Sequence, residues 1–64
     1  MSKLKCIREA AGLSQSQLAT ASNVSIRVIK SYEQGERDIN LAKAIVLYQL
    51  SKALKVSIED LLEI

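Results

Sequence analysis

The chain has one cysteine and no histidine among its 64 residues, and this scarcity of cross-linking groups limits the folds that it can adopt. A single thiol cannot form an intramolecular disulfide, and a zinc site is not expected without histidine or a second cysteine. Domains of this size bury only about 60% of the surface of the unfolded chain. The fold must therefore gain its stability from regular packing of secondary structure, with self-association as a further source.

Composition favours helices. The chain contains no proline and only two glycines, whereas good helix formers such as alanine, leucine and lysine are abundant. No segment approaches the roughly 20 apolar residues of a membrane span, and the first residues lack the apolar run of a signal peptide. We therefore expect one soluble, cytoplasmic, all-α domain over residues 1–64, with no cofactor and no metal or membrane partner.

Capping signals and apolar spacing predict five helices. Ser14 and Gln17 have the spacing of a capping box. Ser25 and Ser57 are N-cap candidates, and the glycines at 12 and 35 suit helix C-termini. The expected helices cover residues 2–11, 14 to 21 or 22, 25–34 and 40–54, with a short one from 57; residues 40–43 could instead form a separate turn. The apolar pattern predicts a core of Leu4, Ile7, Ala11, Leu18, Ala19, Val24, Val28, Ile29, Tyr32, Leu47, Leu50, Leu54, Ile58, Leu61 and Leu62.

The second and third expected helices are short and are joined by a tight turn. Ala19 is small enough for the two helices to cross closely, and Asn23 adopts the left-handed conformation of a turn more easily than most residues. This is the pattern of a helix-turn-helix over residues 15–32, whose second helix starts at Ile26 and enters the major groove of DNA.

The same residues resemble the Cro/C1-type helix-turn-helix family of lambda-like repressors. The resemblance rests on residues 12–19, 23–25, 29 and 32–35, and continues at residues 50, 53–54, 56–57 and 59–62. It covers nearly the whole chain and implies a five-helix lambda repressor-like fold. Two positions depart from the pattern: Asn23 replaces the usual turn glycine, and Ser22 stands where many members are apolar, which predicts a looser corner.

The resemblance also implies roles for single residues. The base-facing positions of the third helix are Ser25, Ile26, Arg27 and Ser31. The positions expected at DNA phosphates are Ser14, Gln15, Lys30, Gln34 and Arg37, and Gln15 is also expected to brace the third helix. Arg8 and Glu33 match a partly buried ion pair between the first and third helices.

The chemistry of these side chains agrees with such roles. Arg27 can bind guanine in a bidentate way, Ile26 can pack on a thymine methyl, and Ser31 discriminates little between bases. Residues 1–55 carry nine basic and four acidic side chains, which suits a positive face toward phosphate. The alternatives are that Arg27 and Lys30 form an ordinary solvated face and that Gln15 is simply the first residue of its helix.

Four apolar residues are harder to place. If Leu47, Leu50 and Leu54 face the core, some of Ile45, Val46 and Tyr48 should reach the surface. We predict that Ile45, Val46, Tyr48 and Ile64 form a dimer contact, so that two recognition helices meet two half-sites on DNA. The alternative is that Ile45 or Val46 packs at an irregular start of the fourth helix.

Two hypotheses of function follow. The first is a sequence-specific regulator of transcription, a repressor of phage, mobile-element or bacterial type that is associated with the nucleoid. The second is a protein-interaction module of the same fold, such as an antitoxin. An enzyme is not expected, because the chain has no histidine and no nucleophile–base pair or phosphate-binding glycine loop. Cys6 is interpreted as a small filler, with a redox-sensing thiol as the alternative.

Overall fold

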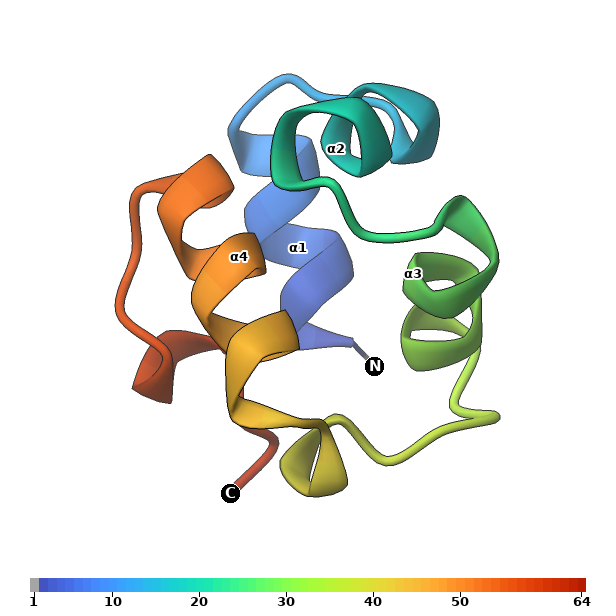
Figure 1. Ribbon diagram of the computed structural model, residues 1–64, viewed down its shortest axis with the longest axis vertical. Coiled ribbons are helices and arrows are strands. Elements are labelled where there is room, and N and C mark those ends of the chain that lie inside the picture. The colour runs from blue at the N-terminus through green and yellow to red at the C-terminus, as the bar shows by residue number, and fades with distance from the viewer. Residues whose placement is uncertain (1) are drawn as a thin grey trace.

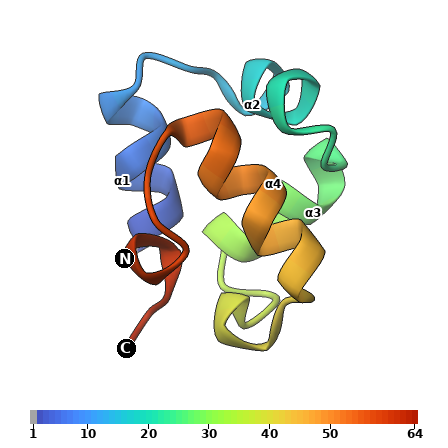
Figure 2. The ribbon, with the colours of Figure 1, turned by 60° about the vertical axis from the view of Figure 1, so that its left-hand side comes forward.

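Residues 2–64, which the computed structural model describes, form four α-helices and two 3-10 turns and contain no strand. The elements are α1 (Lys3–Ala10), α2 (Gln15–Ser22), α3 (Ile26–Glu33), η1 (Ile39–Leu41), α4 (Ala44–Leu54) and η2 (Glu59–Leu61). α2 packs against both α3 and α4, while α1 contacts α3 and η2 (Figures 1 and 2). The all-α class is confirmed, but the number of α-helices is four rather than five.

Serine side chains start the first three helices. Ser2 Oγ accepts a hydrogen bond from the N–H of Lys5, and Ser25 Oγ accepts one from the N–H of Arg27. At the start of α2, Gln17 N–H donates to Ser14 Oγ at 3.0 Å and Ser14 N–H donates to Gln17 Oε1 at 2.8 Å. The capping box expected from the sequence is therefore present, and it fixes the first residue of α2.

All four α-helices are followed by a residue in the left-handed conformation, and α1, α3 and α4 also share one hydrogen-bond pattern there. Gly12 after α1 has φ 75°, Gly35 after α3 has φ 80°, and Lys55 after α4 has φ 59°. In each case the next residue donates its N–H to a carbonyl five residues earlier: Leu13 to Arg8, Glu36 to Ser31, and Val56 to Ser51. This is the Schellman motif. Gly12 and Gly35 indicate it in the sequence, whereas Lys55 does not.

The expected fifth helix is a single 3-10 turn, η2. The cap expected at Ser57 is present, because Asp60 N–H donates to Ser57 Oγ and Ser57 N–H donates to Asp60 Oδ2. The helix stops because Leu62 adopts an extended backbone, with φ −76° and ψ 142°, directly after the fully buried Leu61. Near the fourth helix, residues 39–41 form the separate turn η1, and α4 begins at Ala44.

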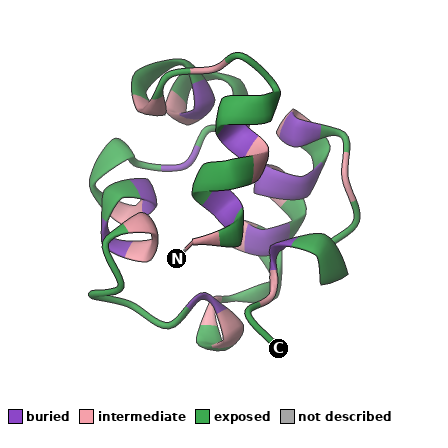
Figure 3. Cartoon of the chain, turned by 180° about the vertical axis from the view of Figure 1, so that it is seen from behind, coloured by how far each residue is buried: buried purple, intermediate pink, exposed green. Residues whose placement is uncertain are grey.

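The core is aliphatic, as the absence of phenylalanine and tryptophan requires. Buried stretches alternate with exposed ones along the helices (Figure 3). The buried apolar residues are Leu4, Leu18, Val24, Ile29, Ile39, Leu47, Leu50, Leu54 and Leu61. Ile39 was missed because it follows a polar loop, whereas Ala11 and Ile58, which the pattern assigned to the core, are exposed at the ends of their elements.

Ser22 does not loosen the turn between α2 and α3. Its side chain is buried, and its hydroxyl donates to the carbonyl of Leu18 at 2.7 Å while accepting the N–H of Val24 at 3.2 Å. Asn23 follows with φ 60° and ψ 29°, the left-handed geometry expected of it. The polar side chain therefore closes the corner, because it satisfies two backbone groups that an apolar residue would leave to other partners.

The left-handed Lys55 predicts a stabilising substitution. Lys55→Gly should raise the free energy of unfolding by about 0.5–1 kcal/mol, because glycine adopts positive φ without steric cost. The matched control is Lys52→Gly inside α4, which should lower it by about 1 kcal/mol. Urea unfolding followed by circular dichroism measures both, and equal losses in the two variants would contradict the strained backbone.

Candidate nucleic-acid interface

The outer face of α3 carries most of the side chains that were expected at DNA. Ser25, Ile26, Arg27, Lys30 and Gln34 are exposed, and Arg37 is exposed on the loop that follows. An open depression of about 350 Å³ runs along this face, lined by Ile26, Arg27, Lys30, Ser31, Gln34 and Glu36. The structure thus brings the proposed contact residues of α3 together on one accessible surface.

Ser31 is placed differently from what the sequence suggested. It is only 8% exposed, and its hydroxyl donates to the carbonyl of Arg27 at 2.9 Å. It is one of the residues that line the depression, and its hydroxyl proton is already donated inside the helix. The expectation that Ser31 contacts a base is therefore weakened, whereas Ile26 and Arg27 are exposed beside it.

Glu36 was not expected on this face. The Schellman motif at Gly35 turns the chain back, so that the N–H groups of Glu36 and Arg37 both bond to the carbonyl of Ser31. Glu36 consequently lines the same depression as Lys30 and Gln34. Gly35 is the sequence signal that could have placed it, since a left-handed C′ residue returns the following residue to the last turn of its helix.

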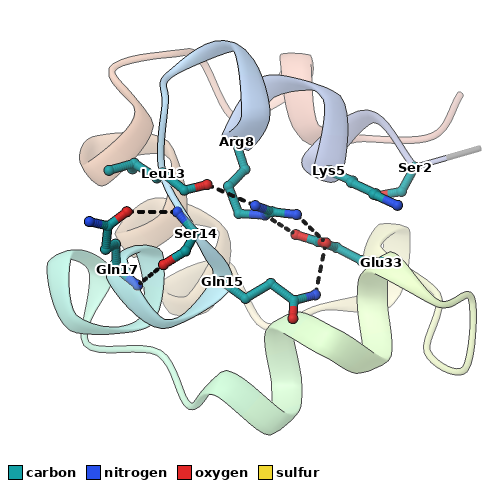
Figure 4. Close-up of polar contacts among 8 residues, drawn as sticks. All are labelled: Ser2, Lys5, Arg8, Leu13, Ser14, Gln15, Gln17 and Glu33. Atoms are coloured by element: carbon teal, nitrogen blue, oxygen red, sulfur yellow. Dashed lines mark hydrogen bonds and ion pairs between the residues drawn. The ribbon is translucent and has the colours of Figure 1, made fainter.

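Glu33, at the end of α3, is the point where α1, α2 and α3 are joined (Figure 4). Arg8 donates to it twice, from Nε to Oε2 at 2.8 Å and from Nη2 to Oε1 at 3.0 Å. Gln15 Nε2 donates to the same Oε1 at 3.0 Å, and Arg8 Nη1 donates to the carbonyl of Leu13 at 2.7 Å. The two charged side chains are 9% and 2% exposed, so the pair is largely shielded from water.

The network fixes the orientation of the Gln15 amide. A carboxylate can only accept hydrogen bonds, so the amide nitrogen of Gln15 must face Glu33 and its oxygen must point away. The amide nitrogen carries two hydrogens, and one of them forms the hydrogen bond to Glu33. Gln15 is half-buried at the first residue of α2, so its second N–H can serve an acceptor outside the protein.

Two opposing effects act on the pKa of Glu33. Burial raises it, but the hydrogen bonds from Arg8 and Gln15 and the charges of Arg8 and Lys5 outweigh burial, so the pKa of Glu33 is lowered. The pKa of Arg8 is raised, chiefly by its hydrogen bonds to Glu33. Both groups are therefore ionised at neutral pH, and the pair is a charged one.

The residues expected at a dimer contact lie on another part of the molecule. Ile45, Tyr48 and Ile64 are exposed, whereas Val46 is half-buried and packs against the core. Val46 therefore follows the alternative in which the start of the fourth helix packs inward. Cys6 is exposed on α1.

The described residues were also compared with the requirements of a metal site and of a membrane span. Within residues 2–64, no three side chains of histidine, cysteine, aspartate or glutamate are grouped so that they could hold a metal ion. None of the described helices is both long and apolar enough to cross a membrane.

Comparison with known proteins places these features in a family. The sequence model of the helix-turn-helix family matches residues 4–61, from α1 to η2. The match includes Arg8, Gln15 and Glu33 as well as the whole of α2 and α3. No curated protein and no solved structure matches the chain.

Breaking the Arg8–Glu33 pair should be costly. Arg8→Ala leaves the Glu33 carboxylate buried without its main partner, which should lower the free energy of unfolding by about 3 kcal/mol. For a domain of this size the melting temperature should fall by at least about 10 °C. Lys3→Ala, an exposed change on the same helix, is the control and should shift it little. A melting temperature for Arg8→Ala equal to that of Lys3→Ala would contradict the assignment.

The lowered pKa of Glu33 predicts a pH dependence. Its contribution to stability is complete above the usual glutamate pKa of 4.5 and is lost as the pH falls through the lowered value. Glu33→Gln cannot titrate, so it should be less stable than the wild type at pH 7, and the difference should shrink below about pH 4. Urea unfolding from pH 7 to pH 3 measures this, and a constant difference would argue against an ionised Glu33.

Proposed function

The chain belongs to the Cro/C1-type helix-turn-helix family of DNA-binding proteins, and we propose that it binds double-stranded DNA sequence-specifically, with α3 in the major groove, to regulate transcription. The observation that carries the proposal is the exposed face of α3, where Ile26, Arg27 and Lys30 line one open depression. An α-helix with such a face fits the major groove, whose edges present a distinct pattern for each base pair.

Base recognition is assigned to the first turn of α3. Arg27 is exposed and offers a forked set of donors that matches guanine O6 and N7. Ile26 is 38% exposed and provides an apolar contact for a thymine methyl group. Ser25 caps the helix with its hydroxyl oxygen, so its proton is available to a base or a phosphate next to the helix N-terminus.

Phosphate contacts are assigned to residues on both sides of α3. The second N–H of Gln15 and the hydroxyl proton of Ser14 lie at the start of α2, where the positive end of the helix dipole favours an anion. Lys30, Gln34 and Arg37 are exposed at the other end of the face. These contacts position the domain without reading sequence, and they make its affinity dependent on salt.

The biological role that we propose is repression, by a domain that occupies its site and excludes other proteins. The basis is the resemblance to lambda-like repressors, which also suggests a phage, mobile element or bacterium as the source and the nucleoid as the location. A homodimer on two half-sites about one helical turn apart fits this role.

A second candidate function is a protein-interaction module of the antitoxin type. Its support is the exposed apolar side chains of η1 and α4, where Leu41 is 82% exposed, Ile45 57% and Tyr48 51%. Failure to bind any DNA at low salt would favour this second function over the first.

Substitutions on α3 separate base reading from phosphate binding. With a site selected from a random DNA pool, Arg27→Ala should weaken binding by about 1–3 kcal/mol and relax specificity at one base pair. Lys30→Ala should weaken binding equally on all sequences and reduce the salt slope by about 1. Lys3→Ala, exposed on α1, is the charge-matched control and should bind as the wild type does. Equal and sequence-independent losses for Arg27→Ala and Lys30→Ala would contradict base reading by Arg27.

A further inference from the structure

The depression along the outer face of α3 is lined by one acidic residue, Glu36. Ile26, Lys30 and Gln34 follow one another at intervals of four residues, so they form one line along the helix. Glu36 comes after the end of this line and borders the same depression. Because a helix advances about 10 Å between Arg27 and Gln34, Arg27 and Glu36 lie toward opposite ends of the face. The face is therefore positive where α3 begins and carries a negative charge where α3 ends.

The fold gives the carboxylate of Glu36 no ionic partner. Its side chain is exposed, and among residues 2–64 the one ion pair is that of Arg8 and Glu33. The residue is held in place by its backbone, since its N–H donates to the carbonyl of Ser31 at 2.9 Å. A negative charge next to the C-terminus of a helix also opposes the helix dipole. The charge of Glu36 is thus unfavourable for α3 itself, and its effect falls on whatever approaches the face.

In the proposed binding mode, phosphates approach the end of α3 at which Glu36 lies. The major groove is about 12 Å wide, so a helix whose first turn contacts base edges has its other end close to a flanking strand. The phosphate contacts of Lys30 and Gln34 are assigned to that end. A carboxylate is negative and can only accept hydrogen bonds, as is also true of phosphate oxygens. Glu36 therefore repels the groups that Lys30 and Gln34 attract.

We propose that Glu36 is a repulsive residue of the DNA-binding face, which lowers the affinity of the domain for DNA of any sequence. The proposal rests on the proposed function, because it requires α3 to lie in the major groove. Phosphates are alike at every site, so the repulsion reduces the part of the affinity that does not depend on sequence. Contrast between bases is left to Ile26 and Arg27, and binding to unrelated DNA, which phosphate contacts alone support, is kept weak.

Removal of the charge tests the proposal. Fluorescence anisotropy measures binding to two duplexes, the site selected from a random DNA pool and an unrelated sequence of the same length. At about 0.1 M salt, Glu36→Gln should bind both duplexes about three to ten times more tightly than the wild type, because one like charge beside the phosphates is gone. Since the side chain of Glu36 is exposed and its backbone makes the bond to Ser31, the variant should fold as the wild type does, which circular dichroism checks.

Glu59→Gln is the matched control, because it makes the same change of net charge at an exposed residue of η2. η2 lies across the molecule from α3 (Figures 1 and 2), and the molecule measures 23 × 21 × 20 Å. The Debye length is about 10 Å at 0.1 M salt, so Glu59 is screened from DNA that is bound at α3. Glu59→Gln should therefore bind both duplexes as the wild type does.

Salt distinguishes repulsion from any change of shape. The advantage of Glu36→Gln over the wild type should shrink as salt is added, because screening weakens the repulsion that the substitution removes. Glu36→Lys replaces the repulsion with a further phosphate contact, so it should bind more tightly still and increase the salt slope by about 1.

Two results would overturn the proposal and retain DNA binding. The first is an unchanged affinity of Glu36→Gln for both duplexes. The second is weaker binding of Glu36→Gln to the selected site alone, which would identify Glu36 as an acceptor for the N4 amino group of cytosine. A wild-type protein that binds no duplex at low salt would reject the proposed function itself, and the role of Glu36 with it.

Discussion

The carboxylate of Glu33 is the group on which the arrangement of the first three helices depends. It accepts from Arg8 on α1 and from Gln15 on α2 while belonging to α3, so one buried charge fixes three elements. Burying an ion pair costs desolvation energy, and an apolar replacement of the same shape can be as stable. An apolar group, however, makes no directional contact. Only a hydrogen-bond acceptor can fix the orientation of the Arg8 guanidinium and of the Gln15 side-chain amide.

The same interaction connects stability to the proposed DNA contact. Gln15 donates one side-chain N–H to Glu33, and its second side-chain N–H remains free to donate. The residue that stabilises the position of α3 therefore also offers a donor at the start of α2. The N-terminus of α2 and the C-terminal end of α3 are therefore positioned by a common group. The charges of Arg8 and Glu33 balance each other within the network, and the exposed Lys30 and Arg37, to which we assign phosphate contacts, take no part in it.

Much of the fold could be predicted from the sequence because its signals are local. Ser14, Gln17, Ser25, Gly12 and Gly35 act through backbone groups within a few residues, and each stands where its spacing placed it. The errors arose where distant parts of the chain decide. The expected fifth helix stops at the extended Leu62, next to Glu63, whose N–H donates to Asn40 from a distant segment. Lys55 adopts a left-handed geometry although it is not a glycine. In the candidate site, exposure along α3 followed from helical spacing, but the burial of Ser31 depends on packing that one sequence does not reveal.

In the proposed mode of DNA binding, the burial of Ser31 limits how many base pairs one copy of the domain can recognise. Because the Ser31 hydroxyl is bonded to the helix backbone, the proposed base recognition depends on Ile26 and Arg27, which can specify about two base pairs between them. A two-base-pair word recurs by chance about once in 16 positions, since four base pairs are distinguishable at each. One copy of such a helix could not select a single site in a genome. Selectivity would then have to come from the spacing and symmetry of two short DNA half-sites that are bound by a pair of copies.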